Sequence, residues 1–357
     1  MHGFGGIDRA GAARIWAFLL LAFGPLGWPA RAQTNAGAQV LPPELSCPDS
    51  LELDLRPNPE RRPGRVQEIA PRAGAVQSPD LYAQGRLAST AYGMYSAFAA
   101  GKDPRLAFAE PDLRLLAMIM GDPGPEGEGP PRRKDTRTFY GFIADEIGTG
   151  RRFIVFRGTQ EPAEWVRNVQ AGQRPYPIGT RQRQASAHVH AGFLKIFESL
   201  KRDGAKSPFT DELAGLVARR DVVFVGHSLG SALATLAGVE ASLRSPQSAA
   251  RLRVVTLASP RVGDMGFALL AARLGRIDRV CNLVDVVTAV PPSTRQVQYT
   301  HVGVVHKISS FDWPELANKL ESPGDQILCW HGDKSYTYML APSPARRPPG
   351  SCALPAQ

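Results

Sequence analysis

The chain has 357 residues and a formal net charge of +9, with 43% hydrophobic and 21% charged residues. These values describe an ordinary globular protein with room for one large domain or two smaller ones, and they exclude a disordered chain. After residue 32, no segment is long and apolar enough to span a bilayer.

The first residues have the pattern of a secretory signal. Arg9 and Arg14 precede an apolar run over residues 15–23, and Ala30-Arg31-Ala32 resembles a cleavage site. We therefore expect residues 1–32 to be a signal peptide and the protein to be secreted or periplasmic. The three arginines and one aspartate of this segment account for +2, which leaves about +7 on the remaining chain.

Export permits disulfide bonds, and four cysteines allow three complete pairings: Cys47, Cys281, Cys329 and Cys352. Cys281 lies in an apolar, strand-like run, which favours a buried free thiol there. Cys47 could instead pair with Cys329 or Cys352. No cysteine has metal-ligand spacing, and we expect neither a metal nor a cofactor.

The following residues divide into an arm, a large domain and a tail. Residues 33–78 are rich in Pro, Arg and Gly and predict an extended N-terminal arm. A helix is expected from Pro79, and a short helix or strand over residues 112–120. The domain extends over residues 79–340, and the Pro-rich residues 341–357 predict a loose tail.

Strands and helices alternate through the rest of the domain. Residues 138–143 and 152–156 predict a strand pair, and further strands are expected at 221–225, 253–258, 279–284 and 301–308. Helices are expected around residues 193–200, 211–219 and 266–274, and directly after residue 228. This alternation predicts an α/β fold with a mostly parallel sheet and helices on both faces.

A serine stands at a sharp turn between a strand and a helix. Gly226-His227-Ser228-Leu229-Gly230 follows the apolar run 221–225 and opens a run of small residues. Such a turn holds its central residue in a strained conformation and exposes the hydroxyl, while the glycines leave room for the crossing backbone. Ser228 is therefore the candidate nucleophile; the alternative is a capping serine in a Gly-rich turn.

A nucleophilic serine needs a base, and the base needs a carboxylate that orients it. On a sheet of this kind the chain order is Ser, acid, His. Three histidines follow Ser228 and a plausible acid: His301, His306 and His331. His331 follows the last expected strand, on a loop free to reach the serine, whereas His301 and His306 fall within that strand. We favour His331, with His301 as the alternative.

The acid should lie at the carboxyl end of a strand. Asp285 follows the apolar strand 280–284 and is the first candidate. Asp264 is the second. Asp278 precedes its expected strand and would lie at the wrong edge of the sheet. A turn or helix-capping role is the alternative for Asp285.

Several motifs in order resemble the class 3 lipase family of α/β-hydrolases over residues 80–340. They are Phe156-Arg157-Gly158-Thr159, Trp165, Asn168, His190-Ala191-Gly192-Phe193, the serine turn, Ala258-Ser259-Pro260-Arg261-Val262-Gly263-Asp264, Asn282-Leu283-Val284-Asp285, Pro291-Pro292, and Tyr299-Thr300-His301-Val302-Gly303.

The resemblance implies an α/β-hydrolase-type fold, Asp285 as the acid, and hydrolysis of carboxylic esters, often acylglycerols. It also implies that Thr159 contributes to the oxyanion hole. The second donor would be the backbone N–H of Leu229, directly after the nucleophile. In the family a short helical lid follows the oxyanion residue. Here residues 160–168 have few large apolar groups besides Trp165 and Val166, which leaves soluble or short-chain esters open.

The expected function is a secreted serine ester hydrolase that acts on acylglycerol or other lipid esters through an acyl-enzyme on Ser228. One alternative is a phospholipase A1-type acyl hydrolase, because the basic runs 132–134 and 181–183 could contact anionic lipid surfaces. A peptidase and a catalytically silent binding protein are further alternatives. We expect a lipid or other ester substrate, transient contact with a lipid surface, and no nucleic-acid partner. The oligomeric state stays open.

Overall fold

A computed structural model describes residues 47, 78–122, 137–160, 172–177, 187–313, 316 and 328–342. The expected signal peptide and both basic runs lie outside these residues, as do nearly all of the expected lid, arm and tail. None of the helices in the described part of the chain combines the length and hydrophobicity of a bilayer-crossing helix.

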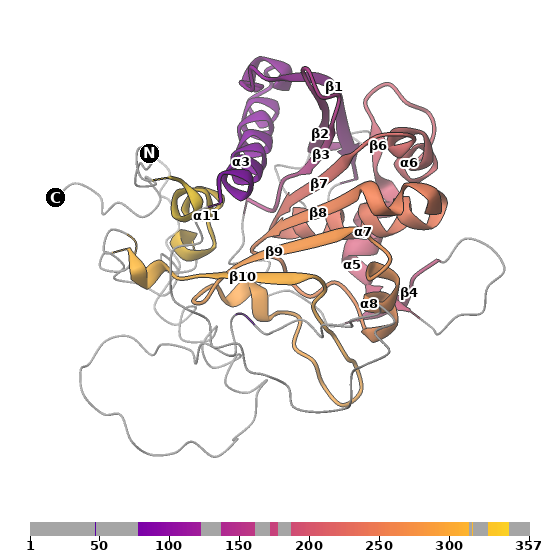
Figure 1. Cartoon of the computed structure of the whole chain (residues 1–357), viewed down its shortest axis with the longest axis vertical. Coiled ribbons are helices and arrows are strands. Elements are labelled where there is room, and N and C mark those ends of the chain that lie inside the picture. Colours follow the sequence, from indigo (N-terminus) through magenta and orange to yellow (C-terminus); the bar gives the residue numbers. More distant parts are fainter. Residues whose placement is uncertain are drawn as a thin grey trace, which may run out of the picture.

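A mixed sheet of eight strands forms the centre of the described structure (Figure 1). In chain order its strands are β1 (Leu113–Gly121), β2 (Thr138–Glu146), β3 (Arg152–Phe156), β6 (Lys201–Arg202), β7 (Val222–His227), β8 (Leu252–Leu257), β9 (Arg276–Asn282) and β10 (Val304–Ile308). Their spatial order is β10-β9-β8-β7-β3-β2-β1-β6. The strands from β10 to β3 are parallel, and β2, β1 and β6 join antiparallel.

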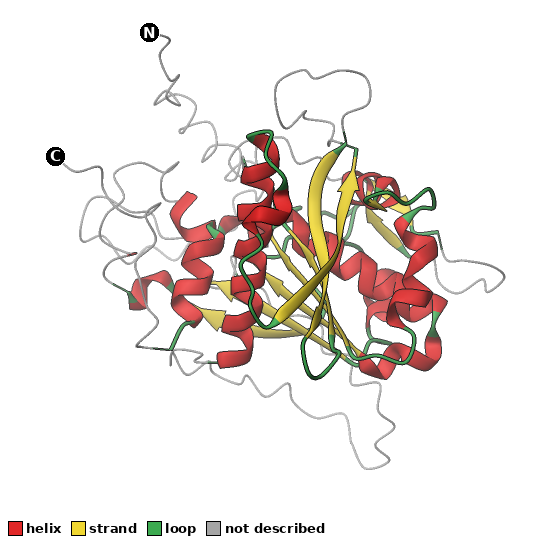
Figure 2. Ribbon diagram, turned by 90° about the horizontal axis from the view of Figure 1, so that it is seen from above, coloured by secondary structure: helices red, strands yellow, loops and turns green. Residues whose placement is uncertain are grey.

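Helices cover both faces of the sheet, as Figure 2 shows. One face packs on α5 (Ala191–Ser199), α6 (Phe209–Val217), α7 (Leu229–Arg244) and α8 (Met265–Ala271). The other packs on α3 (Pro79–Ala99) and α11 (Asp333–Leu340). The mostly parallel α/β fold predicted from the sequence is confirmed.

The alternation of side chains along each strand explains why helices cover both faces of the sheet. In β7, Val222 and Phe224 belong to the core on the α7 side, whereas Val223 and Val225 belong to the core beneath α3. Successive side chains of a strand point to opposite faces, so a continuous apolar run indicates a strand that is buried on both sides.

The remaining described elements are short. They are the two-stranded sheet of β4 (Gln173–Pro175) and β5 (His188–His190), and the 3-10 helices η1 (Pro104–Ala107), η2 (Pro246–Arg251), η3 (Val286–Ala289) and η4 (Ser310–Asp312).

Of the two alternatives expected over residues 112–120, a short helix or a strand, the structure has the strand, β1. Two other expectations need adjustment. β10 begins at Val304, so His301 precedes the last strand. Asp278 lies within β9 and not before it, because that strand begins at Arg276.

Candidate active site

Ser228 stands between β7 and α7 in a strained backbone conformation, with φ 57° and ψ −127°. A non-glycine residue with positive φ is held there only by its surroundings. A Cβ on Gly226 would lie 2.1 Å from the carbonyl oxygen of Gly230, so this close approach requires glycine. The Oγ of Ser231 donates to the carbonyl of Gly226 at 2.8 Å and closes the turn.

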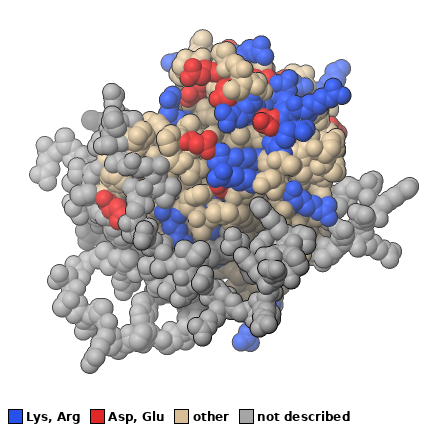
Figure 3. All heavy atoms as spheres, viewed as in Figure 1, with Lys and Arg blue, Asp and Glu red and all other residues tan. Residues whose placement is uncertain are grey.

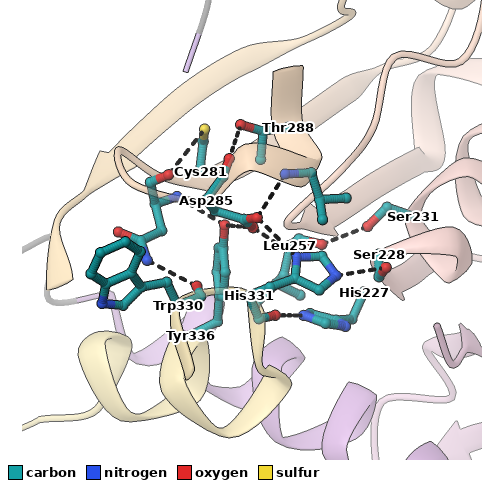
Figure 4. A network of polar contacts seen from close by, with 12 residues as sticks. His227, Ser228, Ser231, Leu257, Cys281, Asp285, Thr288, Trp330, His331 and Tyr336 are labelled. Carbon is teal, nitrogen blue, oxygen red and sulfur yellow. Dashed lines mark hydrogen bonds and ion pairs between the residues drawn. The ribbon is translucent and has the colours of Figure 1, made fainter. Parts of the chain in front are cut away.

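Three side chains that are distant in the sequence meet at this turn (Figure 4). The Nε2 of His331 lies 2.8 Å from the Oγ of Ser228. The Nδ1 of His331 lies 3.0 and 2.9 Å from the two carboxylate oxygens of Asp285. All three residues are at most 2% exposed. A carboxylate only accepts hydrogen bonds, so Nδ1 carries the proton and Nε2 is free to accept one from the serine.

His331 reaches the serine from a helical stretch and not from a loop. Residues 328–331 are helical, and Gly332 then precedes α11. This stretch follows β10 in the chain, as the sequence predicts.

Asp285 is held by neighbours on both sides. Its Oδ1 accepts from the N–H of Val287 at 3.0 Å, so Asp285 also caps η3. Its Oδ2 accepts from the hydroxyl of Tyr336 at 2.7 Å. The same hydroxyl accepts from the N–H of Asn282 at 2.9 Å. Burial, with the adjacent Asp285, raises the pKa of Tyr336 well above 10.0, so this phenol stays a donor.

Asn282, the last residue of β9, connects this strand to the segment that carries His331. Its Nδ2 donates to the Oγ of Ser310 at 2.8 Å and to the carbonyl of Trp330 at 2.9 Å. Sequence reasoning missed the contacts of Asn282 and Tyr336. The available signal was their position close to Asp285 and His331 in the chain.

His227 forms a second link to the segment that carries His331. Its Nε2 lies 2.7 Å from the carbonyl oxygen of His331, and its Nδ1 lies 2.9 Å from the hydroxyl of Tyr92 on α3. Burial, and then the nearby His331, lowers the pKa of His227 well below 6.5. The ring is therefore neutral: Nε2 donates to the carbonyl, and Tyr92 donates to Nδ1. Nothing in the local sequence indicates this pairing.

The segment after β3 passes directly beside Ser228. A Cβ on Gly158 would lie 2.6 Å from the Cβ of Ser228. The next residue, Thr159, is buried, and its Oγ1 has no hydrogen-bond partner among the described residues. Unpaired buried hydroxyls are uncommon in proteins, because each one loses its hydrogen bonds to water. The Oγ1 of Thr159 is therefore a candidate donor to a ligand. Leu229 begins α7, and the first N–H groups of a helix have no acceptor within it.

Arg157 holds the peptide between Gly158 and Thr159. Its Nη1 donates to the carbonyl of Gly158 at 2.7 Å, its Nε donates to the carbonyl of Phe139 at 2.6 Å, and its guanidinium lies 3.7 Å from the ring centre of Tyr95. In a trans peptide the carbonyl and the following N–H point in opposite directions. Arg157 therefore turns the N–H of Thr159 away from itself.

The other candidate acids have different partners. Asp264 caps α8, and its Oδ2 lies 3.0 Å from the Nδ1 of His188. Asp278 binds Arg253 at 2.8 Å and Arg276 at 2.7 Å. Burial opposes ionisation of Asp278, but these hydrogen bonds, with one from a histidine, outweigh it and lower its pKa.

The other candidate histidines are also engaged elsewhere. The Nε2 of His301 lies 2.8 Å from the carbonyl of Thr288, and burial, followed by two nearby arginines, lowers its pKa well below 6.5. His306 lies in β10, with its Nε2 2.8 Å from Asp278.

The prediction of a free thiol at Cys281 is wrong. Cys47 and Cys281 form a disulfide across 234 residues of sequence. Cys329 is also disulfide-bonded, whereas Cys352 lies outside the described residues. Within the described ranges, no three His, Cys, Asp or Glu side chains are grouped to hold a metal ion.

Trp165 and Asn168, like the rest of residues 161–171, lie outside the described residues.

Comparison with known proteins agrees with the motifs. Residues 153–295 match the model of the family Lipase (class 3). Phospholipase A1-II 4 of Oryza sativa subsp. japonica is 32% identical over 234 residues, which cover 58% of this chain and 56% of that protein. A lipase of Rhizopus niveus is 31% identical over 190 residues, which cover 50% and 46%. The chain thus spans about half the length of these relatives.

Among solved structures, a Rhizomucor miehei triacylglyceride lipase superposes with a TM-score of 0.49 at 22% identity, over 66% of this chain and 82% of that chain. The resemblance to the class 3 lipase family stated from the sequence is confirmed by the family match, which covers residues 153–295.

Proposed function

We propose that the protein hydrolyses carboxylic esters of lipids through an acyl-enzyme on Ser228. The hydrogen-bonded order Ser228–His331–Asp285 at a strained turn is the observation that supports this most directly. The family match and the lipase and phospholipase names of the relatives support the lipid character of the ester. The catalytic unit would be residues 79–340.

In the proposed reaction, Ser228 Oγ attacks the ester carbonyl while Nε2 of His331 takes its proton. Asp285 stabilises the imidazolium through Nδ1. The N–H of Leu229 and the N–H and hydroxyl of Thr159 would bind the oxyanion, and each such donor lowers the barrier by about 3 kcal/mol. His331 then protonates the leaving alcohol, and a water molecule activated by the same nitrogen releases the acid.

The test compares wild type with Ser228→Ala on p-nitrophenyl esters. We expect a loss of kcat of at least about a thousandfold, and loss of labelling by a fluorophosphonate probe. Equal rates in the two proteins would refute the proposal. Absence of labelling in folded wild type would favour the silent binding protein instead.

A phospholipase A1-type activity is the second candidate, because the plant relative cited above is named a phospholipase A1. The two candidates differ in the alcohol that leaves. Two sets of substrates distinguish these activities. The first is a series of glyceryl and p-nitrophenyl esters of increasing acyl length. The second is a phosphatidylcholine that carries different acyl chains at sn-1 and sn-2. Selective release of the sn-1 acid would identify the phospholipase.

We also propose that residues 1–32 direct export and are removed before Gln33. The signal pattern supports this, and so does the Cys47–Cys281 disulfide, because disulfides persist in oxidising compartments. N-terminal sequencing of the exported protein tests it; a chain that retains its first 32 residues in the cytosol would refute it.

A further inference from the structure

We propose that a pocket at the amino ends of β3, β7 and β8 binds a phosphate-bearing anion. The hollow has a volume of about 790 Å³. We call it the arginine pocket, after its charged lining residues Arg151, Arg219, Arg220, Arg251, Arg253 and Asp221.

Positive charges outnumber negative charges around this pocket. Five guanidinium groups and one carboxylate line it. Three of these arginines are paired with carboxylates: Arg253 with Asp278 at 2.8 Å, Arg151 with Glu146 at 3.0 Å and Arg220 with Asp145 at 3.4 Å. In the part of the chain that the structure describes, neither Arg219 nor Arg251 forms an ion pair with a carboxylate. The pocket therefore keeps a positive potential that an anion would relieve.

The turn that carries two of these arginines is strained. Arg219 has φ 57°, which is a left-handed backbone conformation. This conformation is unfavourable for any residue that has a Cβ atom. This turn connects α6 to β7 and brings Arg219 and Arg220 into the pocket lining. Strained residues of this kind concentrate at binding sites, where the surrounding structure holds them.

The chemistry of the lining selects phosphate. Guanidinium groups present a planar set of N–H donors that matches phosphate oxygens in pairs. The volume is within the range of about 300–1,000 Å³ for small-molecule sites and exceeds the needs of one phosphate ion. A soluble phosphorylated molecule and the headgroup of an anionic phospholipid share this chemistry.

The pocket lies at the amino ends of the parallel strands, and Ser228 lies at their carboxyl ends. Val222, at the start of β7, lines the pocket, and Ser228 follows the end of the same strand. Six residues of strand separate the two by about 20 Å. The anion is thus a second ligand and not the ester that reaches Ser228.

The surface charge agrees with an anion site. Figure 3 shows that Lys and Arg side chains gather on the upper part of the molecule, with fewer acidic groups among them.

The test uses the full chain with Arg219→Gln and Arg251→Gln combined. The matched control combines Arg174→Gln and Arg295→Gln, which removes the same charge from two exposed arginines outside the pocket. The probes are inorganic pyrophosphate, followed by calorimetry, and phosphatidylglycerol vesicles, followed by sedimentation, with phosphatidylcholine vesicles as the blank. Both are measured at about 0.15 M ionic strength to screen general surface attraction.

We expect wild type and control to bind pyrophosphate, and the pocket variant to bind it at least about tenfold more weakly. Binding of pyrophosphate alone identifies a soluble ligand, whereas pocket-dependent binding of vesicles alone identifies the headgroup. Equal affinity of the two double variants, or no binding of either probe by wild type, would overturn the proposal. Ser228→Ala should bind like wild type and the pocket variant should keep wild-type esterase activity, so the result is independent of the proposed hydrolysis.

Discussion

The hydroxyl of Tyr336 donates to Oδ2 of Asp285 at 2.7 Å while it accepts from the backbone N–H of Asn282 at 2.9 Å. The acid of the proposed triad is thus held by the helix that follows its base. The phenol is fully buried, so water cannot replace it if the hydroxyl is removed.

Tyr336→Phe should lower kcat about tenfold with little change in KM, because Asp285 loses a charge-assisted hydrogen bond but substrate contacts are kept. Steady-state kinetics on a p-nitrophenyl ester measure this. Tyr338→Phe is the control, because Tyr338 lies on the same helix but its ring meets Trp313 edge to face; this variant should retain its rate. A full kcat in Tyr336→Phe would show that the hydroxyl does not position the acid.

Thr159→Val tests the hydroxyl donor of the proposed oxyanion hole. The change keeps the shape and the backbone N–H but removes Oγ1, which has no partner among the described residues. We expect kcat to fall about a hundredfold or more, because one oxyanion donor is lost. Thr159→Ser restores a hydroxyl and should recover most of the rate. If both variants are equally impaired, the backbone position matters and the hydroxyl does not.

Arg157→Lys separates charge from geometry. A lysine keeps the positive charge, but its single ammonium group cannot reproduce the donors to Phe139 and Gly158 or the flat contact with Tyr95. We expect kcat to fall at least about tenfold, because the Thr159 peptide is no longer held. Thermal unfolding should be recorded beside the kinetics. A destabilised variant with an unchanged rate would assign Arg157 a purely structural role.

His227 makes stability depend on pH. Burial lowers its pKa far below 6.5, so the unfolded chain takes up a proton as the pH falls through 6.5 while the folded protein does not. The free energy of unfolding should therefore fall with decreasing pH below 6.5.

In His227→Gln, the slope of the unfolding free energy against pH should be shallower by about one proton, or about 1.4 kcal/mol per pH unit. Urea denaturation at several pH values measures it. His301→Gln should act in the same direction, because burial lowers that pKa too. An unchanged slope in His227→Gln would contradict a neutral ring in the folded state.

The Cys47–Cys281 disulfide closes a loop of 234 residues. Replacing both cysteines with alanine should lower the free energy of unfolding by about 2–5 kcal/mol, because the unfolded chain gains freedom. Denaturant midpoints under oxidising conditions measure this, and Cys47→Ala alone should show a loss of similar size. An unchanged midpoint would mean that the bond only tethers the N-terminal segment.

Much of the fold and of the candidate site follows from short-range signals. The apolar run 221–225, the two glycines and the small residues after Ser228 are neighbours in the chain, and together they specify a strand, a turn and a helix. Chain order, together with the place of Asp285 after an expected strand and of His331 beyond the last one, then puts these two residues ahead of other acids and bases. Local periodicity and steric limits on the backbone are sufficient for such features.

Contacts between distant segments required the folded chain. Tyr92 meets His227 across 135 residues, and Cys47 pairs with Cys281 across 234. The arginine pocket is assembled from the segments that precede β3, β7 and β8 and from the first residues of β7 and β8. Periodicity reports which face of an element is buried but not which element covers it. Those pairings depend on strand order and helix packing, which the whole chain settles cooperatively when it buries its core.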